Sequence, residues 1–390
     1  MPVEATKAVL AYAALWSAAT LVIALVWRRT SRRRITIKPF ILIIRIADEQ
    51  TVTKLDGAWK SKRVKSALVA GPFVLVALQL LFYHSALQNI ASMLGGGERI
   101  PVAVPLLPGL TISVETFLLM TPGLAIAVAV HELAHALAAI SSGVKVKSVG
   151  LALVAGILPL AFVEPDEDEL KSSKPWDRVM MYSAGVYANA VAGALVLLLI
   201  YMLTLSGSYL IVLSVEEGSP AAAAGLQRGM LVEEVVINGT EARTLNEFVK
   251  QLHMLREQHG GTLANVTLVF QFKTPQGTEV LVRKPSRASP SNYTEEFYER
   301  IGIQVSEIPR IMAALPLSPL ASYNLFLAIR YTAFLNLGLG IINAAPLFIT
   351  DGAQVVREAA TQLLGIDRGS IVAFVVSLIT LIILIPGLAL

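Results

Sequence analysis

Long apolar stretches constrain the fold of this 390-residue chain more than any other feature. A helix needs about 20 consecutive apolar residues to cross the hydrocarbon core of a bilayer. The composition agrees, because 15% of the residues are charged, whereas about 25% is usual in a soluble domain. We therefore expect a multi-span α-helical membrane protein with about six transmembrane helices in contact with the lipid bilayer. The stretches of sufficient length are 8–27, 66–86, 116–141, 177–205, 322–346 and 369–389.

Basic residues predict the orientation of these spans. Lysines and arginines cluster between the first two stretches, and positively charged loops stay on the cytoplasmic side. Counting spans from that loop places the N-terminus and residues 206–321 outside the cytoplasm and residues 142–176 inside. The first stretch is too long for a signal-peptide core, so we expect it to be retained. The clustered residues are Arg28, Arg29, Arg32, Arg33, Arg34, Lys54, Lys60, Lys62, Arg63 and Lys65.

These clusters also explain most of the net charge of +4. Such a charge is typical of membrane topology, and we expect no nucleic-acid partner. The chain has no cysteine, which excludes disulfides and thiolate metal sites. Together with the apolar stretches, this charge pattern predicts an integral, multi-pass protein of the cell membrane.

A charged segment at 209–309 differs from its apolar surroundings. Strand-like alternation with Gly and Pro punctuation predicts a soluble α+β module, and TLNEFVKQLHML within it predicts an amphipathic helix. Three glycosylation sequons begin at Asn238, Asn265 and Asn292, all within this segment. Their clustering agrees with a location outside the cytoplasm.

Two further apolar stretches, 100–113 and 146–165, are interrupted by Pro and Gly and rich in β-branched residues. Irregular backbone persists at membrane depth only where protein or a water-filled cavity satisfies its polar groups. We expect both stretches to be re-entrant or interfacial β-like hairpins around a cavity. The predicted regions are spans one and two with the basic loop (1–115), the first part of the membrane core (116–208), the module (209–309), and the second part of the core with the last span (310–390).

The sequence AVAVHELAHALAA, residues 127–139, places three ionisable side chains inside an apolar stretch. His131 and His135 are four residues apart, so on a helix they share one face and can bind one metal ion. Unpaired ionisable groups at bilayer depth cost several kcal/mol, which indicates a shared partner. Glu132 lies about 100° around the helix, where it can hold a water beside the metal. This is the H-E-x-x-H pattern of zinc hydrolases, with the glutamate as general base and then proton donor.

A catalytic zinc usually has three protein ligands and one open position. Among the other histidines, His84 lies at the wrong depth, and His253 and His259 belong to the outer module. Asp351 in NAAPLFITDGAQ follows the fifth apolar stretch, near the cytoplasmic face and at the expected depth of the histidine pair. It is the candidate third ligand. Its alternative role is to cap the helix that follows.

Asn189 is a buried polar residue of the fourth stretch, within MYSAGVYANAVAG. The small residues around it allow this helix to pack closely against a neighbour. Its amide could form a structural interhelical hydrogen bond, or it could donate to a substrate carbonyl or oxyanion beside the zinc. Asn343 has a similar ambiguity.

Three motifs resemble those of the site-2 protease family, which are intramembrane zinc metalloproteases. HELAHALAA resembles the HExxH core, SAGVYANAVAG resembles the Gly-x-x-x-Asn motif at Gly185 and Asn189, and NAAPLFITDG keeps the Asn, Pro and Asp-Gly spacing of the third motif. The resemblance covers most of the chain from about residue 115 onward. Departures are Val186, where many members have Pro, and Phe348 and Thr350 in the third motif.

The resemblance implies a role for each candidate residue. His131, His135 and Asp351 would bind Zn²⁺, Glu132 would activate water, and Asn189 would assist. The implied reaction is hydrolysis of a peptide bond within or near a transmembrane helix of a single-span or multi-span membrane-protein substrate. Such cleavage belongs to regulated intramembrane proteolysis.

A transmembrane helix hides its carbonyls in its own hydrogen bonds, so the substrate must unwind locally. We expect 100–113 or 146–165 to offer a strand edge that clamps the unwound peptide. The sequence PLAFVEP, residues 159–165, also resembles the loop that follows the family's first motif.

The outer module resembles a PDZ domain of the protease-associated kind. The matching residues are Gly218-Ser219-Pro220-Ala221, Ala224-Gly225-Leu226 and Ile237-Asn238-Gly239, while Gly229-Met230 replaces the usual Gly-Asp. The resemblance implies that the module binds a peptide or a substrate segment by adding a strand to a sheet edge.

Two other classes of function fit part of the pattern. A PDZ-bearing membrane scaffold would carry a structural metal or none, but such a site needs no Glu132 beside an open position. A transporter would also place ionisable residues within spans, but the chain shows no internal repeat.

Overall fold

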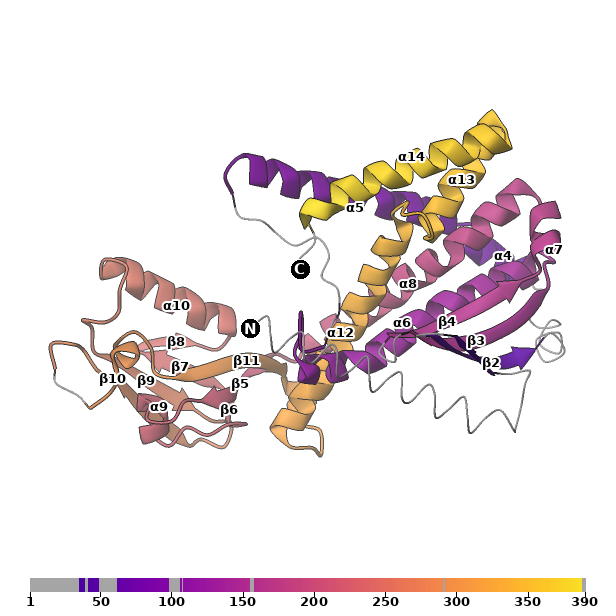
Figure 1. Cartoon of the computed structure of the whole chain (residues 1–390). Helices are drawn as coiled ribbons and strands as arrows, with labels where there is room; N and C mark the ends of the chain where they lie inside the picture. The colour runs from indigo at the N-terminus through magenta and orange to yellow at the C-terminus, as the bar shows by residue number, and fades with distance from the viewer. Residues whose placement is uncertain are drawn as a thin grey trace. The chain divides into compact units, whose positions relative to one another are not determined.

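The computed structural model describes residues 35–38, 41–48, 62–97, 106, 108–154, 158–289 and 292–387. The expected first span and most of the stretch 100–113 lie outside these residues. Within them, five helical segments are long and apolar enough to cross a membrane (Figure 1), as expected of a multi-span helical membrane protein. These segments are Lys62–Leu94, which comprises α4 (Lys62–Leu68) and α5 (Gly71–Leu94), α6 (Val114–Ser141), α8 (Pro175–Thr204), α12 (Pro319–Ala344) and Ile366–Gly387, which comprises α14 (Ile366–Leu384) and η2 (Ile385–Gly387).

The chain forms two compact units. The first comprises residues 1–196 and 331–390, and the second comprises residues 197–330. The predicted module, 209–309, lies within the second unit. The boundaries expected at 115, 208 and 309 remain predictions.

Glycines allow α6, α8 and α12 to pack closely in the first unit. A Cβ at Gly123 of α6 would lie 2.8 Å from the Cα of Thr332, and one at Gly193 of α8 would lie 2.6 Å from Leu337. Small residues at such crossings are typical of membrane helices, because they let the backbones approach. Ser113 caps the start of α6 by accepting from the N–H of Thr116 at 3.0 Å.

A four-stranded antiparallel sheet packs beside α6. Its order is β1-β2-β3-β4, with β1 at Ile35–Lys38, β2 at Ile41–Asp48, β3 at Val146–Val154 and β4 at Leu158–Pro165. The stretch 146–165 therefore forms two paired strands, as its β-branched composition indicated. Strands β1 and β2 were not expected, since they lie in the region assigned to the basic loop. The apolar run of β2 pairs with β3 more than 100 residues later in the chain.

Gly150 lies in β3 between β2 and β4, where its neighbours leave no room for a side chain. It pairs with Arg45 of β2 and with Phe162 of β4. A Cβ at Gly150 would lie 2.5 Å from the carbonyl oxygen of Ile44 and 2.6 Å from the Phe162 ring. The Phe162 ring therefore covers the glycine. Strand β4 is the strand of this sheet that lies next to α6 (Figure 1).

Two shorter helices complete the first unit. Helix α7 (Glu167–Ser172) follows β4 directly, and Asp166 caps it by accepting from the N–H groups of Asp168 and Glu169, both at 3.0 Å. Helix α13 (Asp351–Leu364) follows α12 and packs against α14.

The second unit contains two small antiparallel sheets and a helix. One sheet has the order β10-β9-β7-β8 and the other β11-β5-β6. Both contribute to one apolar core, together with the amphipathic helix α10 (Leu245–Gln258) that the sequence predicted. The remaining elements are β5 (Ser208–Val215), α9 (Pro220–Ala223), β6 (Leu231–Val232), β7 (Glu234–Ile237), β8 (Thr240–Ala242), β9 (Leu268–Lys273), β10 (Glu279–Lys284), η1 (Glu295–Tyr298), β11 (Ile303–Pro309) and α11 (Arg310–Ala313).

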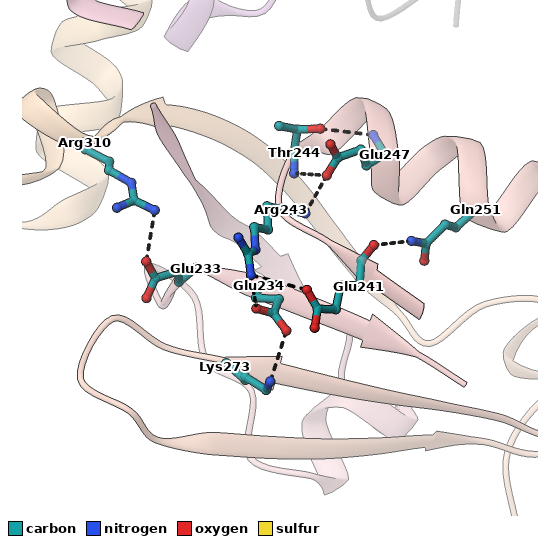
Figure 2. Close-up of polar contacts among 9 residues, drawn as sticks. All are labelled: Glu233, Glu234, Glu241, Arg243, Thr244, Glu247, Gln251, Lys273 and Arg310. Atoms are coloured by element: carbon teal, nitrogen blue, oxygen red, sulfur yellow. Dashed lines mark hydrogen bonds and ion pairs between the residues drawn. The ribbon is translucent and has the colours of Figure 1, made fainter. Parts of the chain in front are cut away.

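Polar contacts fix α10 against the strands before it (Figure 2). Thr244 and Glu247 form a capping box, in which Oγ1 of Thr244 accepts from the N–H of Glu247 and a Glu247 carboxylate oxygen accepts from the N–H of Thr244, both at 3.2 Å. Gln251 donates to the carbonyl of Glu241 on β8 at 2.5 Å. A capping residue is worth about 1 kcal/mol, so the helix start is firmly held.

Candidate metal centre

Helix α6 places His131 and His135 on one face, as the spacing predicted. Their Nε2 atoms lie 3.2 Å apart, and the His131 side chain is buried. Both rings therefore present the same nitrogen to one point.

Asp351 meets this pair from a distant part of the sequence. It is the first residue of α13, and its Oδ2 lies 3.2 Å from Nε2 of His131 and 3.4 Å from Nε2 of His135. Among the described residues that could hold a metal ion, these three form a group, with ligand atoms within 4.8 Å of one another.

The N-cap of α13 is Thr350 rather than Asp351. Oγ1 of Thr350 accepts from the N–H of Leu347 at 3.1 Å and of Ala353 at 3.4 Å, so the alternative role considered for Asp351 was wrong. Gly352 also matters, because a Cβ there would overlap the carbonyl of Ala344 at the end of α12. The threonine cap and the glycine together leave the Asp351 carboxylate free to face the histidines.

The three ligand atoms have the spacing that a tetrahedral zinc ion needs. Bonds of 2.0–2.1 Å in a tetrahedron place neighbouring ligand atoms about 3.3–3.4 Å apart. The observed separations are 3.2, 3.2 and 3.4 Å. Oδ2 of Asp351 is buried and makes no hydrogen bond of normal geometry with the described residues, so a cation would satisfy it. The residues present therefore fit the metal.

Gly185 of α8 leaves room beside the ligand atoms. A Cβ at this position would lie 2.5 Å from Nε2 of His135 and 2.6 Å from Nε2 of His131. Any side chain would fill the space that the two imidazoles face. The motif glycine is thus required by the geometry of the centre.

Glu132 lies outside the ligand group, on the neighbouring part of the α6 surface. Its side chain is half-buried, and Oε2 accepts from the backbone N–H of Val163 on β4 at 3.1 Å. The glutamate therefore lies between the candidate metal ligands and the edge of the sheet.

Helix α8 contacts the other ring nitrogen of each histidine. Nδ1–H of His135 donates to the backbone carbonyl of Met181 at 2.8 Å. Nδ1 of His131 lies 3.2 Å from the side-chain amide of Asn189, which is fully buried. No residue pattern could indicate the Met181 carbonyl, because every residue carries one. Asn343 is half-buried near the end of α12 and is not one of the three clustered residues.

Comparison with known proteins identifies the family. The model of peptidase family M50 matches residues 116–386, which include all of these side chains. This chain belongs to peptidase family M50, the site-2 protease family. Members of the family are zinc metalloproteases, and the apolar helices described above are those expected of an integral membrane protein.

Two relatives match parts of the chain. An uncharacterized protein of Methanocaldococcus jannaschii is 30% identical over 238 residues, which are 60% of this chain and 54% of that protein. A membrane-bound transcription factor site-2 protease homolog of Arabidopsis thaliana is 38% identical over 78 residues, or 20% of this chain and 15% of that protein. The chain thus spans about half the length of the first relative and less of the second.

Proposed function

We propose that this protein is an intramembrane zinc metalloprotease that hydrolyses a peptide bond within or near a transmembrane helix of a single-span or multi-span membrane protein, in regulated intramembrane proteolysis. The observation that carries the proposal is the spacing of His131, His135 and Asp351 with Glu132 beside them. A structural metal site needs no carboxylate base next to it, so this arrangement favours an enzyme over a scaffold.

Each residue of the centre has a proposed task. His131, His135 and Asp351 would hold Zn²⁺, which when bound supplies Lewis acidity to the scissile carbonyl and to a water. Glu132 takes a proton from the attacking water and delivers it to the leaving amine as the peptide bond breaks. Asn189 assists from α8. Because Glu132 is not a ligand, its carboxylate remains available for both proton transfers.

Strand β4 offers an edge for the unwound substrate. It pairs with β3 on one side, and no other described strand pairs with it. The N–H of Val163 points away from β3, since it donates to Glu132, whereas the N–H of Asp166 donates back to Lys145 next to β3 at 2.8 Å. In an antiparallel ladder this direction alternates along the strand. Residues 159, 161, 163 and 165 therefore direct their backbone groups to the free edge.

Two of these four outward positions are prolines, Pro159 and Pro165. Proline has no backbone N–H, and it is tolerated on an edge strand where that group would face outward. The N–H of Val163 already donates to Glu132, so among these four residues the edge offers an uncommitted outward N–H donor only at Ala161. We propose that the outward backbone groups of Ala161, with the outward carbonyl of Val163, bind one short extended segment of the substrate and present it beside Glu132.

The second unit contains a cavity beside an open strand edge. A cavity of about 290 Å³ lies between α10 and the start of β11, with Phe248, Leu252 and Ile303 in its lining. Strand β11 pairs with β5 and has no second partner among the described strands. Strand addition at this edge would bury an extended peptide against α10. We propose that this PDZ-like module docks a peptide or a substrate segment.

The proposed topology follows from the basic loop and the sequons. The N-terminus and the module would face outward from the cell membrane, and the metal centre would lie near the cytoplasmic face. Asn238 is exposed in the turn between β7 and β8, where its positive φ of 48° suits a tight hairpin. A glycan on this asparagine would therefore have room.

The decisive experiment compares cleavage of a panel of single-span substrates by the wild-type protein and by Glu132→Gln, in detergent with zinc. The variant retains the helix and the three ligands and removes the base. We expect product from the wild type alone, with equal zinc content in both proteins. Equal cleavage by both proteins would sink the proposal.

A further inference from the structure

Asn189 contacts a proposed ligand rather than the open part of the centre. Its side chain is fully buried, and Nδ2 faces Nδ1 of His131 at 3.2 Å. Oδ1 is also buried and has no hydrogen-bond partner among the described residues. The carboxamide therefore has one group at the histidine and one group without a partner.

Ligation of a metal by Nε2 decides which group belongs at the histidine. A neutral imidazole carries one proton, so a ring that binds metal through Nε2 carries its proton on Nδ1. Nδ1–H needs an acceptor, and an amide nitrogen cannot accept. Rotating the Asn189 carboxamide by half a turn exchanges its oxygen and nitrogen and leaves all other atoms in place. Oδ1 then accepts from His131.

The neighbouring histidine shows the same arrangement. Nδ1–H of His135 donates to the Met181 carbonyl, which can only accept. Met181, Gly185 and Asn189 are spaced by four residues, so they lie along one face of α8. This face therefore supplies one acceptor for each imidazole. Gly185 lies between the two acceptors, where any side chain would collide with the imidazoles.

We infer that Asn189 is a positioning residue, whose side-chain oxygen holds His131 in the tautomer and ring orientation that present Nε2 to the metal. The inference rests on the proposed zinc site. It differs from the donor role considered from the sequence, because Asn189 acts through His131 rather than on the substrate. Groups that orient metal-binding histidines typically contribute 10- to 100-fold in metal affinity.

Zinc affinity of the purified full-length protein, measured by competition with a chelator, tests this role without any substrate. Asn189→Leu removes the acceptor, and Asn189→Asp retains one. The matched control is Asn336→Leu, since Asn336 is equally buried but donates to the carbonyl of Thr332 on its own helix. The visible spectrum of the cobalt-loaded proteins reports the ligand geometry independently.

We expect Asn189→Leu to weaken zinc binding about 10- to 100-fold and to alter the cobalt spectrum, with Asn189→Asp and Asn336→Leu within a few-fold of wild type. Wild-type zinc affinity in Asn189→Leu would overturn the inference, as would equal losses in Asn189→Leu and Asn189→Asp. Those results would leave the proposed function intact. A wild-type protein that binds no zinc would overturn both.

Discussion

Gly185 lies so close to His135 that a Cβ would come within 2.5 Å of its Nε2. The two residues belong to different helices, and the glycine is the point at which α8 passes the ligand atoms. The space for the proposed metal is thus defined by an absent side chain as much as by the three candidate ligands.

Gly185→Ala should therefore weaken binding of the metal at the centre. The new methyl group would occupy the space that both imidazoles face, and we expect zinc affinity to fall by more than about 10-fold with a parallel loss of cleavage. Isothermal titration with zinc measures the effect. The control is Gly338→Ala on α12, where an added Cβ meets no atom within 4 Å. Full zinc binding by Gly185→Ala would contradict the proposed location of the metal.

Ala161→Pro tests the substrate edge of β4. Proline removes the outward N–H donor that Glu132 does not engage, without removing a bond to β3. Losing one hydrogen bond of about 1.4 kcal/mol should lower kcat/KM for a membrane substrate about 10-fold, while zinc affinity stays unchanged. Ala161→Val changes the side chain and keeps the donor, so it should cleave normally. If the proline variant cleaves as fast as the valine variant, the substrate does not bind this edge.

Much of the centre could be predicted because its signals are local. A four-residue spacing in an apolar helix suffices to pair His131 with His135, and a depth argument suffices to select Asp351. The Met181 carbonyl and the Glu132–Val163 contact could not be predicted, because backbone groups leave no trace in the residue types. Their positions depend on how α8 and β4 pack against α6.

The sheet shows a different limit of sequence reasoning. Strands β3 and β4 were recognisable from their β-branched composition. Strand β2 lies among basic residues, and these indicated a cytoplasmic loop rather than a strand. Its pairing with β3 joins segments that are separated by α4, α5 and α6, and no local pattern specifies such a partner. The run 41–48 is nevertheless rich in isoleucine, which was the available signal.

The ion pair between Arg178 and Glu358 should hold α13 against α8. Nε and Nη2 of Arg178 donate to the two carboxylate oxygens of Glu358 at 2.9 and 2.7 Å, and both side chains are largely buried. Glu358 lies two turns after Asp351 on α13. A double-mutant cycle with Arg178→Met and Glu358→Gln should give a coupling energy of about 1–3 kcal/mol in chemical denaturation. Each single variant should also bind zinc several-fold more weakly, since Asp351 would lose its support. Additive single effects would show that the pair is not coupled.

Lys284→Met should loosen the proposed peptide-binding module. The lysine is 1% exposed, and its Nζ donates to the carbonyls of Leu263, Pro285 and Tyr298 at 2.6–2.9 Å. Methionine fills a similar volume but leaves three carbonyls without this donor. We expect hydrogen exchange of β10 to accelerate about 5- to 150-fold, equivalent to roughly 1–3 kcal/mol. Lys250→Met, at an exposed position on α10, should leave exchange unchanged. Equal exchange in both variants would assign the buried amine no stabilising role.

The same lysine predicts a pH dependence of the module. Burial lowers the pKa of the Lys284 amine below its ordinary value. The unfolded chain therefore binds more protons than the folded module between the folded and unfolded pKa values, so stability should rise with pH across that window. Hydrogen exchange of the wild type and of Lys284→Met at several pH values, corrected for intrinsic exchange, isolates this contribution. A rise of the same size in both proteins would show that another group causes it.

The two prolines of β4 have a consequence for how copies of the protein meet in the membrane. An open strand edge is normally a template for pairing with an identical edge on a second molecule, and such pairing propagates into aggregates. A continuous ladder between two β4 edges would need donors at Pro159 and Pro165, and neither residue has one. The edge that we propose for a short incoming peptide is therefore poorly suited to pairing with a second copy of itself.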